Sequence, residues 1–458
     1  MSDLLRLYGL GANAMFAQHK RLATSGNNIA NAATPGHSRQ VVQLQSLGGN
    51  GLGSGGVFAG SAMRVSDPLL TLRERQADAA FGFHSEASRA LATTEAELLT
   101  SSRNLPATIS DFFAALSRVT ASPSDEILRR AFIEEGVALT RAFGSISAGY
   151  DAMQLDADQR SRELVSEVNR WTSELAAANR AMSGAGSPDP AVADRRDLAA
   201  RNLAELVGGR ARVDADGMMR VVLPTGQALV DGHRALQMRM SGGGASGQPP
   251  TFELVDGLRV DAMPLPTEGR LGGLLDFRMS TLDGARVELD ALAYDFATQF
   301  NQVHNAHAGL EDLVPRDFFV QPGQAQGAAA GMQVSAEIVS DHRNLASRSG
   351  ALGPGDNSGL LALSALAEQP LAAGGTRPFT AEAIRMMSDL GAEVAGSRMQ
   401  EGIAAERRHV LAGFRDAVSG VSLEEETFLL SEAQRVAEAA MRFVSVVDDL
   451  LGHLIRTL

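Results

Sequence analysis

Four short segments of this 458-residue sequence carry residue types that could bind a ligand or catalyse a reaction. The first, Gly51-Leu-Gly53-Ser-Gly55-Gly56, has the G-x-G-x-x-G spacing with which a turn before a helix cradles a dinucleotide pyrophosphate. That fingerprint needs a buried strand before it and a helix after it, and neither is evident in the flanking sequence. We therefore interpret residues 48–61 as a flexible glycine-rich loop rather than a nucleotide site.

Two further segments could in principle hold a metal ion. Asp214, Asp216 and Gly217 resemble the beginning of a calcium-binding loop, but its twelfth position is Thr225 instead of a bidentate glutamate. Asp-Ala-Asp-Gly between two apolar stretches predicts a β-hairpin turn instead. His304 and His307 form an H-x-x-H pair on an expected helix, but the surrounding NQVHNAHAG contains neither a third zinc ligand nor a catalytic glutamate. We expect no metal and no cofactor.

The fourth segment is the acidic run Glu424-Glu425-Glu426, which favours the beginning of the last helix because carboxylates interact well with the helix dipole there. The sequence contains no G-x-S-x-G nucleophile motif and no phosphate-binding P-loop. It also contains no cysteine, which excludes disulfides, thiolate metal sites and cysteine nucleophiles. No constellation supports an enzyme, although a central β-rich part with an unrecognised site stays open as an alternative.

Composition narrows the remaining classes of function. The chain is 44% hydrophobic and 21% charged, which is typical of folded proteins. Its formal net charge of −13 argues against nucleic-acid binding, which needs a basic face. No apolar run approaches the roughly 20 residues of a membrane span. The N-terminus lacks the basic and apolar regions of a cleaved secretory signal.

Both ends of the chain carry the heptad spacing of coiled-coil helices. At the C-terminal end apolar residues alternate three and four apart up to Leu458, and at the N-terminal end they recur every seven residues. The expected interface consists of Tyr8, Met15, Leu22, Ile29, Leu430, Ala433, Ala437, Ala440, Val444, Val447, Leu451 and Leu454.

The charges of the two ends favour their pairing. Residues 1–47 carry a net charge of +3, and residues 421–458 carry −4. Neither helix can bury its apolar seam alone, so we expect the two ends to pair. We also expect both ends to be largely disordered in the monomer and to fold during assembly with identical neighbours. A head-to-tail contact that repeats without closing a ring builds a helical array.

Between the ends the sequence predicts helices, then a β-rich insert, then helices. Ser66-Asp67-Pro68 begins a long helix that runs to about Ser102, and further helices follow to about 182. Short strands are expected over 211–255, and helices return over 270–305 and from about 380. The fold class is therefore mainly α with an inserted β module (α+β). The expected domains are a terminal coiled-coil domain (1–60 with 420–458), a helical-bundle middle domain (61–195 with 270–308 and 356–419) and an outer β-rich domain (196–269 with 309–355).

A turn motif follows the first helix. The segment ATSGNNIANAATPGHSR resembles the signature shared by flagellar rod, hook and hook-associated proteins, in which an Asn/Ala-rich helix end precedes Thr-x-Gly and an aromatic residue or histidine. The residues that carry this resemblance are Asn27, Asn28, Asn31, Thr34, Gly36, His37 and Arg39.

Other segments narrow the resemblance to the family of hook–filament junction proteins. These are DRRDLAARNLAELV (194–207), GQALVDG (226–232), GRLGGLLDFR (269–278), the Asn–His helix at 292–307 and GVSLEEETFLL with the helix that it opens (420–458). They follow the order of that family, whereas residues 309–375 match it poorly. The DRRDL, GQALV and LGGLLDFR segments argue against the nearest alternative, another axial subunit of the hook or rod.

The resemblance implies a structural subunit of the bacterial flagellum. Such subunits form a helical ring with copies of themselves, between the hook protein and a second junction protein that leads to the filament. They are extracellular and leave the cell through the flagellar type III apparatus without signal cleavage. An export chaperone binds their C-terminal helix. A secreted helical effector is a less favoured alternative, because it would lack the NNIANAATPG turn.

Overall fold

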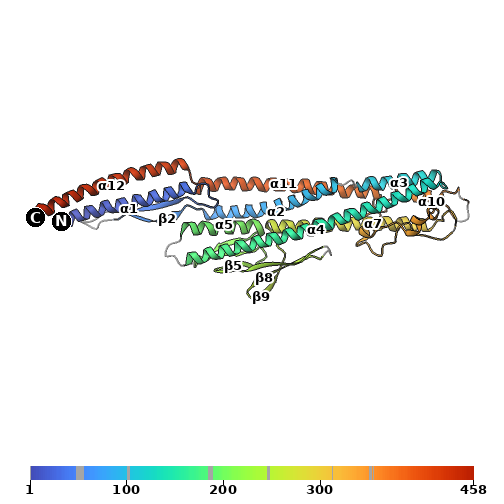
Figure 1. The fold of residues 1–458 in the computed structure, drawn as a ribbon, viewed down its shortest axis with the longest axis horizontal. Helices are drawn as coiled ribbons and strands as arrows, with labels where there is room; N and C mark the ends of the chain where they lie inside the picture. Colours follow the sequence, from blue (N-terminus) through green and yellow to red (C-terminus); the bar gives the residue numbers. More distant parts are fainter. Residues whose placement is uncertain are drawn as a thin grey trace.

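The chain forms a long, thin molecule with both termini at one end (Figure 1). The computed structural model describes residues 2–47, 56–100, 104–183, 189–244, 248–311, 313–349, 353 and 355–457. Most of the G-x-G-x-x-G segment and the last seam position, Leu458, lie outside this range. None of the described helices is both long and apolar enough to cross a membrane.

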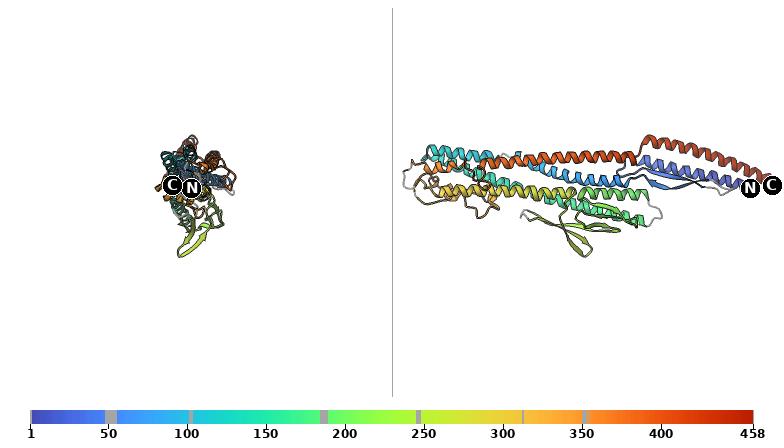
Figure 2. Two further views of the ribbon diagram at one scale, coloured as in Figure 1. Left: turned by 90° about the vertical axis from the view of Figure 1, so that its right-hand side faces the viewer. Right: turned by 180° about the vertical axis from the view of Figure 1, so that it is seen from behind.

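The two terminal helices lie antiparallel and form a stalk. Helix α1 (Ser2–Ala30) runs beside α12 (Leu423–Thr457), as Figures 1 and 2 both show. Gly11 lies against Val444 near the tip, and Arg21 pairs with Glu432 at 3.5 Å farther along. The pairing expected from the charges of the two ends is therefore present within one chain.

A β-hairpin packs along α1. Strand β1 (Gln40–Leu47) pairs antiparallel with β2 (Gly56–Arg64), in a register that joins Gln40 to Arg64 and Leu47 to Gly56. The interpretation of residues 48–61 as a loop is wrong for 56–61, which are part of β2. Pairing with β1 supplies the backbone hydrogen bonds of this glycine-containing stretch, which has little strand propensity of its own. We call α1, β1, β2 and α12 the stalk.

Long helices form the body of the molecule. They are α2 (Pro68–Thr100), α3 (Leu105–Ala121), α4 (Glu126–Ser183), α5 (Pro190–Val207), α6 (Gly269–Asp276), α7 (Asp283–Asn305) and α11 (Phe379–Ser419). Asp67 and Asp125 cap α2 and α4 by accepting bonds from backbone N–H groups of the first turn. A π-helical turn (Phe277–Leu282) joins α6 to α7, so the single helix expected over 270–305 has three parts.

The core at the far end of the body is built from aromatic rings. Phe112 packs on Phe132 at 4.8 Å between ring centroids and on Phe300 at 5.3 Å. Phe318 and Phe319 join the same cluster, and both side chains are fully buried. Because α3, α4, α7 and the segment after α7 all contribute rings, this cluster ties segments far apart in sequence into one core.

The described part of residues 309–349, which we expect in the outer β-rich domain, contacts α4 and α7 of the helical body, and the division into domains stays a prediction. Phe318 and Phe319 hold this segment to the aromatic cluster, and its helices are short: α8 (Ala328–Gly331), α9 (Ala336–Ser340) and a 3₁₀ turn (His342–Asn344). The segment lacks the alternating apolar pattern of a strand. Its position on the body follows from the burial of Phe318 and Phe319 in the aromatic cluster. Helix α10 (Ser358–Ala365) packs nearby on α3 and α7.

The β-rich insert forms two small antiparallel sheets on one side of α4, from which a hairpin projects (Figure 2). One sheet contains β3 (Arg210–Val213), β4 (Met219–Val222), β5 (Ala228–Asp231) and β6 (Arg234–Ala235). The other contains β7 (Gln237–Gly242), β8 (Pro250–Asp256) and β9 (Arg259–Met263). The sequence did not predict β9, whose exposed polar residues resemble a loop.

Two asparagines of α4 fasten these sheets to the body. Asn179 donates to the carbonyl oxygens of Met219 and Gly232, and its own side-chain oxygen accepts from the Met219 N–H. Asn169 makes the same two-way contact with the backbone of Met238. Helix α5 runs through position 195/196, where we expect a domain boundary, and it packs on both α2 and α4.

Candidate assembly site on the stalk and its joint with the body

The α12 half of the expected seam faces α1. Ala433, Ala437, Ala440 and Val447 are buried, while Leu430, Val444 and Leu451 are half-buried and Leu454 is 37% exposed. The buried members are mostly alanines, so the two helices approach closely and bury little apolar area for each residue.

The α1 half of the seam is more mixed. Met15, Leu22 and Ile29 are half-buried, but Tyr8 is 41% exposed. Several small or polar residues of this helix are buried instead, among them Gly11, Gln18 and Ser25, which lie three residues after the expected ones. A Cβ on Gly11 would come within 2.6 Å of the Val444 Cγ2 atom. Gly11, Gln18 and Ser25 repeat every seven residues, as Tyr8, Met15, Leu22 and Ile29 do. Sequence analysis missed them because none of the three is a large apolar residue.

Large apolar side chains remain exposed over much of the stalk. On α12 one set lies beside the seam and repeats with the same heptad spacing, and α1 exposes others toward its beginning. The exposed set comprises Leu5, Leu7, Tyr8, Leu10, Phe16, Phe428, Val436, Phe443, Val446 and Leu450.

The turn motif after α1 is held by side-chain hydrogen bonds. Asn28 is fully buried: its amide donates to the Gln40 carbonyl at 2.9 Å, and its oxygen accepts from the Gln40 N–H at 3.0 Å. Asn31 donates to the carbonyl oxygen of Asn27 at 3.0 Å, and Thr34 donates to Asn31 at 3.2 Å. The motif therefore ends α1 and begins β1 at a defined place.

Gly36 and His37 contact the body. Gly36 has φ of +83°, a conformation that favours glycine, and lies on Leu198 of α5. His37 lies 3.6 Å from the Asp194 carboxylate, which also accepts from the Ser38 N–H at 3.2 Å. Burial raises the pKa of Asp194, while the nearby Arg64 guanidinium works in the opposite direction.

Arg39 connects the turn to the beginning of α12. Its guanidinium lies 2.8 Å from Glu426, which is 1% exposed, and 3.0 Å from Glu425. The Arg39 N–H donates to the Ser419 carbonyl at the end of α11. The acidic run therefore pairs with the turn motif as well as capping α12, a contact that the sequence interpretation did not include.

Ion pairs from β2, α2 and α5 complete this joint between stalk and body. Arg64 and Arg75 reach the two oxygens of Asp197 at 2.5 and 3.0 Å. A small cavity of about 70 Å³ lies beside them. Asp194 and Asp197 belong to the DRRDL segment, which the sequence analysis singled out. The sequence did not indicate that this segment contacts the turn motif.

The other candidate segments have ordinary structural roles. Asp214 and Gly217 form the β3–β4 turn, in which the Gly217 N–H donates to the Asp214 carbonyl at 2.9 Å. Both nitrogens of the buried His304 are engaged, Nδ1 with the Arg316 carbonyl and Nε2 with the Ala346 N–H. Among the described residues, no cluster of three or more potential ligands could hold a metal ion.

Sequence comparisons place the chain among flagellar proteins. Residues 91–319 match a family described as the flagellar hook-associated protein FlgK helical domain, and residues 10–37 match the flagella basal body rod protein family. The chain is 27% identical to flagellar hook-associated protein 1 of Escherichia coli (strain K12) over 332 residues, which cover 70% of this chain but only 60% of that relative.

Two further similarities extend along the chain. Flagellar hook-associated protein 1 of Bacillus subtilis (strain 168) is 25% identical over 490 aligned residues, which cover 96% of both chains. The solved structure of the flagellar hook junction protein FlgK from Burkholderia pseudomallei matches with a TM-score of 0.65. That alignment covers 78% of this chain and all of the other at 15% identity, so it supports the fold alone: mainly α with inserted β strands.

Proposed function

Because the chain belongs to the flagellar hook-associated protein family, whose helical domain matches residues 91–319, we propose that it is a structural subunit of the junction between hook and filament. The observation that carries this proposal is the stalk. Its two helices come from opposite ends of the chain, and apolar side chains stay exposed beside their contact. Such a surface suits repeated packing on copies of the same chain.

The proposal includes the partners that this position requires. One side of the ring would contact the hook protein, and the other a second junction protein that leads to the filament. The subunit would be exported through the flagellar type III apparatus without signal cleavage and act outside the cell. An export chaperone would bind α12, because Val436, Phe443 and Val446 are exposed on that helix and would otherwise promote aggregation.

A deletion strain tests the proposed position. We expect electron microscopy to reveal hooks without filaments, together with flagellin released into the medium. The match of residues 10–37 to rod proteins supports one other candidate, an axial subunit nearer the cell. Loss of the hooks as well would favour that candidate, and normal filaments would contradict both.

Substitutions in the seam test the role of the stalk. Ala437→Asp and Val444→Asp place a charge on the α1–α12 contact, where Ala437 is 3% exposed and Val444 lies against Gly11. We expect these variants to complement the deletion poorly while their bodies stay folded by circular dichroism and limited proteolysis. Ser445→Asp is the control, because Ser445 is exposed beside the seam. Normal filaments with Ala437→Asp and Val444→Asp would contradict the seam assignment.

A further inference from the structure

The outer face of α11 carries a row of exposed apolar side chains. Met399, Ile403, Val410 and Phe414 are 60%, 58%, 44% and 58% exposed. Their spacing places them on one face of the helix. Gly402 and Gly413 lie along the same row, and no atom lies within 4 Å of where their Cβ atoms would be. We call Met399, Ile403, Val410 and Phe414 the α11 stripe.

The opposite face of α11 is fastened to the body by charged groups. Arg408 pairs with the fully buried Asp78 of α2 at 2.8 Å, and its guanidinium also lies 4.7 Å from the ring centre of Phe81. Arg398 pairs with Glu95 at 2.6 Å. A surface helix normally turns its apolar side inward and its charges outward. The inward face of α11 buries Val394 and Ala404, whereas the large apolar side chains of the stripe face outward. We take this exposed row as a sign that another protein covers the α11 stripe.

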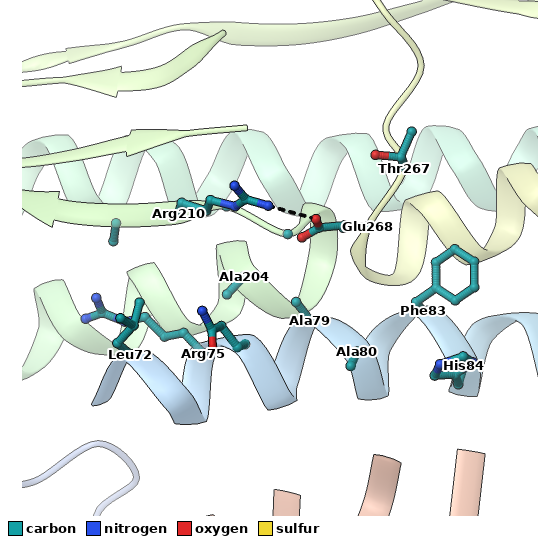
Figure 3. Close-up of a pocket in the computed structure, with 14 residues that line it drawn as sticks. Leu72, Arg75, Ala79, Ala80, Phe83, His84, Ala204, Arg210, Thr267 and Glu268 are labelled. Atoms are coloured by element: carbon teal, nitrogen blue, oxygen red, sulfur yellow. Dashed lines mark hydrogen bonds and ion pairs between the residues drawn. The ribbon is translucent and has the colours of Figure 1, made fainter. Parts of the chain in front are cut away.

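A second surface on the same molecule is concave. A groove of about 640 Å³ lies between α2, the end of α5, β3 and the turn before α6 (Figure 3). Its lining includes Ala79, Ala80 and Phe83 of α2, and on the opposite side Arg210 pairs with Glu268 at 3.0 Å. The groove and the stripe have no residue in common.

We propose that the α11 stripe of one copy packs into the α2–α5 groove of a second copy. Two different surfaces that meet in this way form a heterologous contact, which repeats along a helical array instead of closing a dimer. The exposed Glu406 lies between Ile403 and Val410 on α11, and the lining of the groove contains two arginines, Arg75 and Arg210, against one glutamate, Glu268. The charges of the two surfaces therefore favour this contact.

The position of the stripe also favours a second copy as the partner. The exposed residues Leu423 and Phe428 follow it across the break between α11 and α12. Both helices lie along the same edge of the molecule (Figure 1). Exposed apolar residues thus occur on both sides of the break, at the end of the body and at the beginning of the stalk. This inference rests on the proposed function and adds the contact between bodies.

Disulfide crosslinking tests the contact directly, because the chain contains no cysteine of its own. We would introduce Met399→Cys, Ile403→Cys, Val410→Cys or Phe414→Cys, each combined with Leu72→Cys or Ala80→Cys at the groove. A disulfide requires Cα atoms within roughly 7 Å of each other, so several pairs are needed to match the register. Flagella isolated from strains carrying each full-length variant would be oxidised, denatured without reductant and probed by immunoblot.

The expected result is a ladder of multimers for at least one stripe–groove pair and for neither of its single-cysteine variants. The control pair combines each stripe cysteine with Val287→Cys, which is exposed on α7 outside both surfaces. Dimers from a stripe cysteine alone, or equal ladders with the control, would overturn the inference. The absence of any ladder in flagella that contain the protein would overturn it while leaving the proposed function intact. Absence of the protein from flagella would overturn both.

Discussion

Single polar side chains decide where the stalk meets the body. Asn28 replaces a strand partner for both backbone groups of Gln40, and Arg39 joins the turn after α1 to Glu425 and Glu426 at the beginning of α12. Buried polar groups of this kind are costly unless every partner is present. The motif therefore has a structural role: its hydrogen bonds and ion pairs hold the turn after α1 to β1 and to the beginning of α12, where stalk and body join.

Arg129 of α4 has a comparable role at the other end of the body. It is fully buried, and it donates to the carbonyl oxygens of His342 at 2.9 Å, Pro123 at 2.7 Å and Leu345. Burial lowers its pKa to about 10. We expect Arg129→Met to lower the free energy of unfolding by about 3 kcal/mol, because several carbonyl groups lose their donor.

Urea denaturation would measure this change, with Arg130→Met as the matched control. Arg130 is its exposed neighbour and pairs with Glu126 one turn away, a contact typically worth less than about 1 kcal/mol. Equal destabilisation by the two substitutions would refute the role that we assign to Arg129.

At the scale of secondary structure, α7 organises the far end of the body. Phe296 and Phe300 place their rings in the aromatic cluster, and His304, one turn farther, bonds to the segment that follows. Three elements that local sequence patterns alone would assign to loops therefore gain fixed positions by packing on one helix. They are the segments around Phe318, Ile338 and Leu345, all of which are buried.

His304 makes the stability of this region depend on pH. Burial lowers its pKa from 6.5 to about 4, and the positive charge of Arg129 acts in the same direction. The unfolded chain therefore binds a proton more readily, so the contribution of His304 is complete above about pH 6.5 and is lost as the pH falls toward 4. The total loss is about 3 kcal/mol.

Urea denaturation at a series of pH values would reveal this dependence. We expect His304→Gln to flatten the change in stability between pH 6.5 and 4. His307→Gln, at a half-buried position three residues farther along the chain, is the control and should leave the slope of the wild-type protein. An unchanged slope in His304→Gln would contradict the assignment.

At the scale of the whole molecule, stalk and body differ in how they are stabilised. The body buries large rings and aliphatic side chains, whereas α1 and α12 bury mainly small or polar side chains. Apolar burial contributes about 25 cal/mol per Å², so the stalk gains little stability from its own contact. Packing between copies would supply the rest.

Hydrogen exchange of the monomer tests this difference. We expect the amides of α1 and α12 to exchange much faster than those of α3 and α4, because local opening of the stalk exposes little apolar surface. Incorporation into flagella should protect both terminal helices. Strong protection of α1 and α12 in dilute monomer would refute the expectation that they order during assembly.

Features with local or periodic signals could be predicted from the amino-acid sequence. The heptads of α12, the capping aspartates before α2 and α4, and the Asp-Gly turn between β3 and β4 each act within a few residues. The pairing of the two ends could also be inferred, since opposite charge and matching heptads are visible at any separation.

Contacts between segments far apart in the sequence could not be predicted and depend on the folded chain. The meeting of His37 with Asp194, the strand partner of β2 and the attachment of residues 309–355 to the aromatic cluster all depend on packing across long sequence separations. Gly11, Gln18 and Ser25 were missed because the close approach of a second helix, rather than apolar character, buries them. Whether a side chain is buried depends on which other segment packs on it. Composition and local spacing do not specify that segment when it lies far away in the sequence.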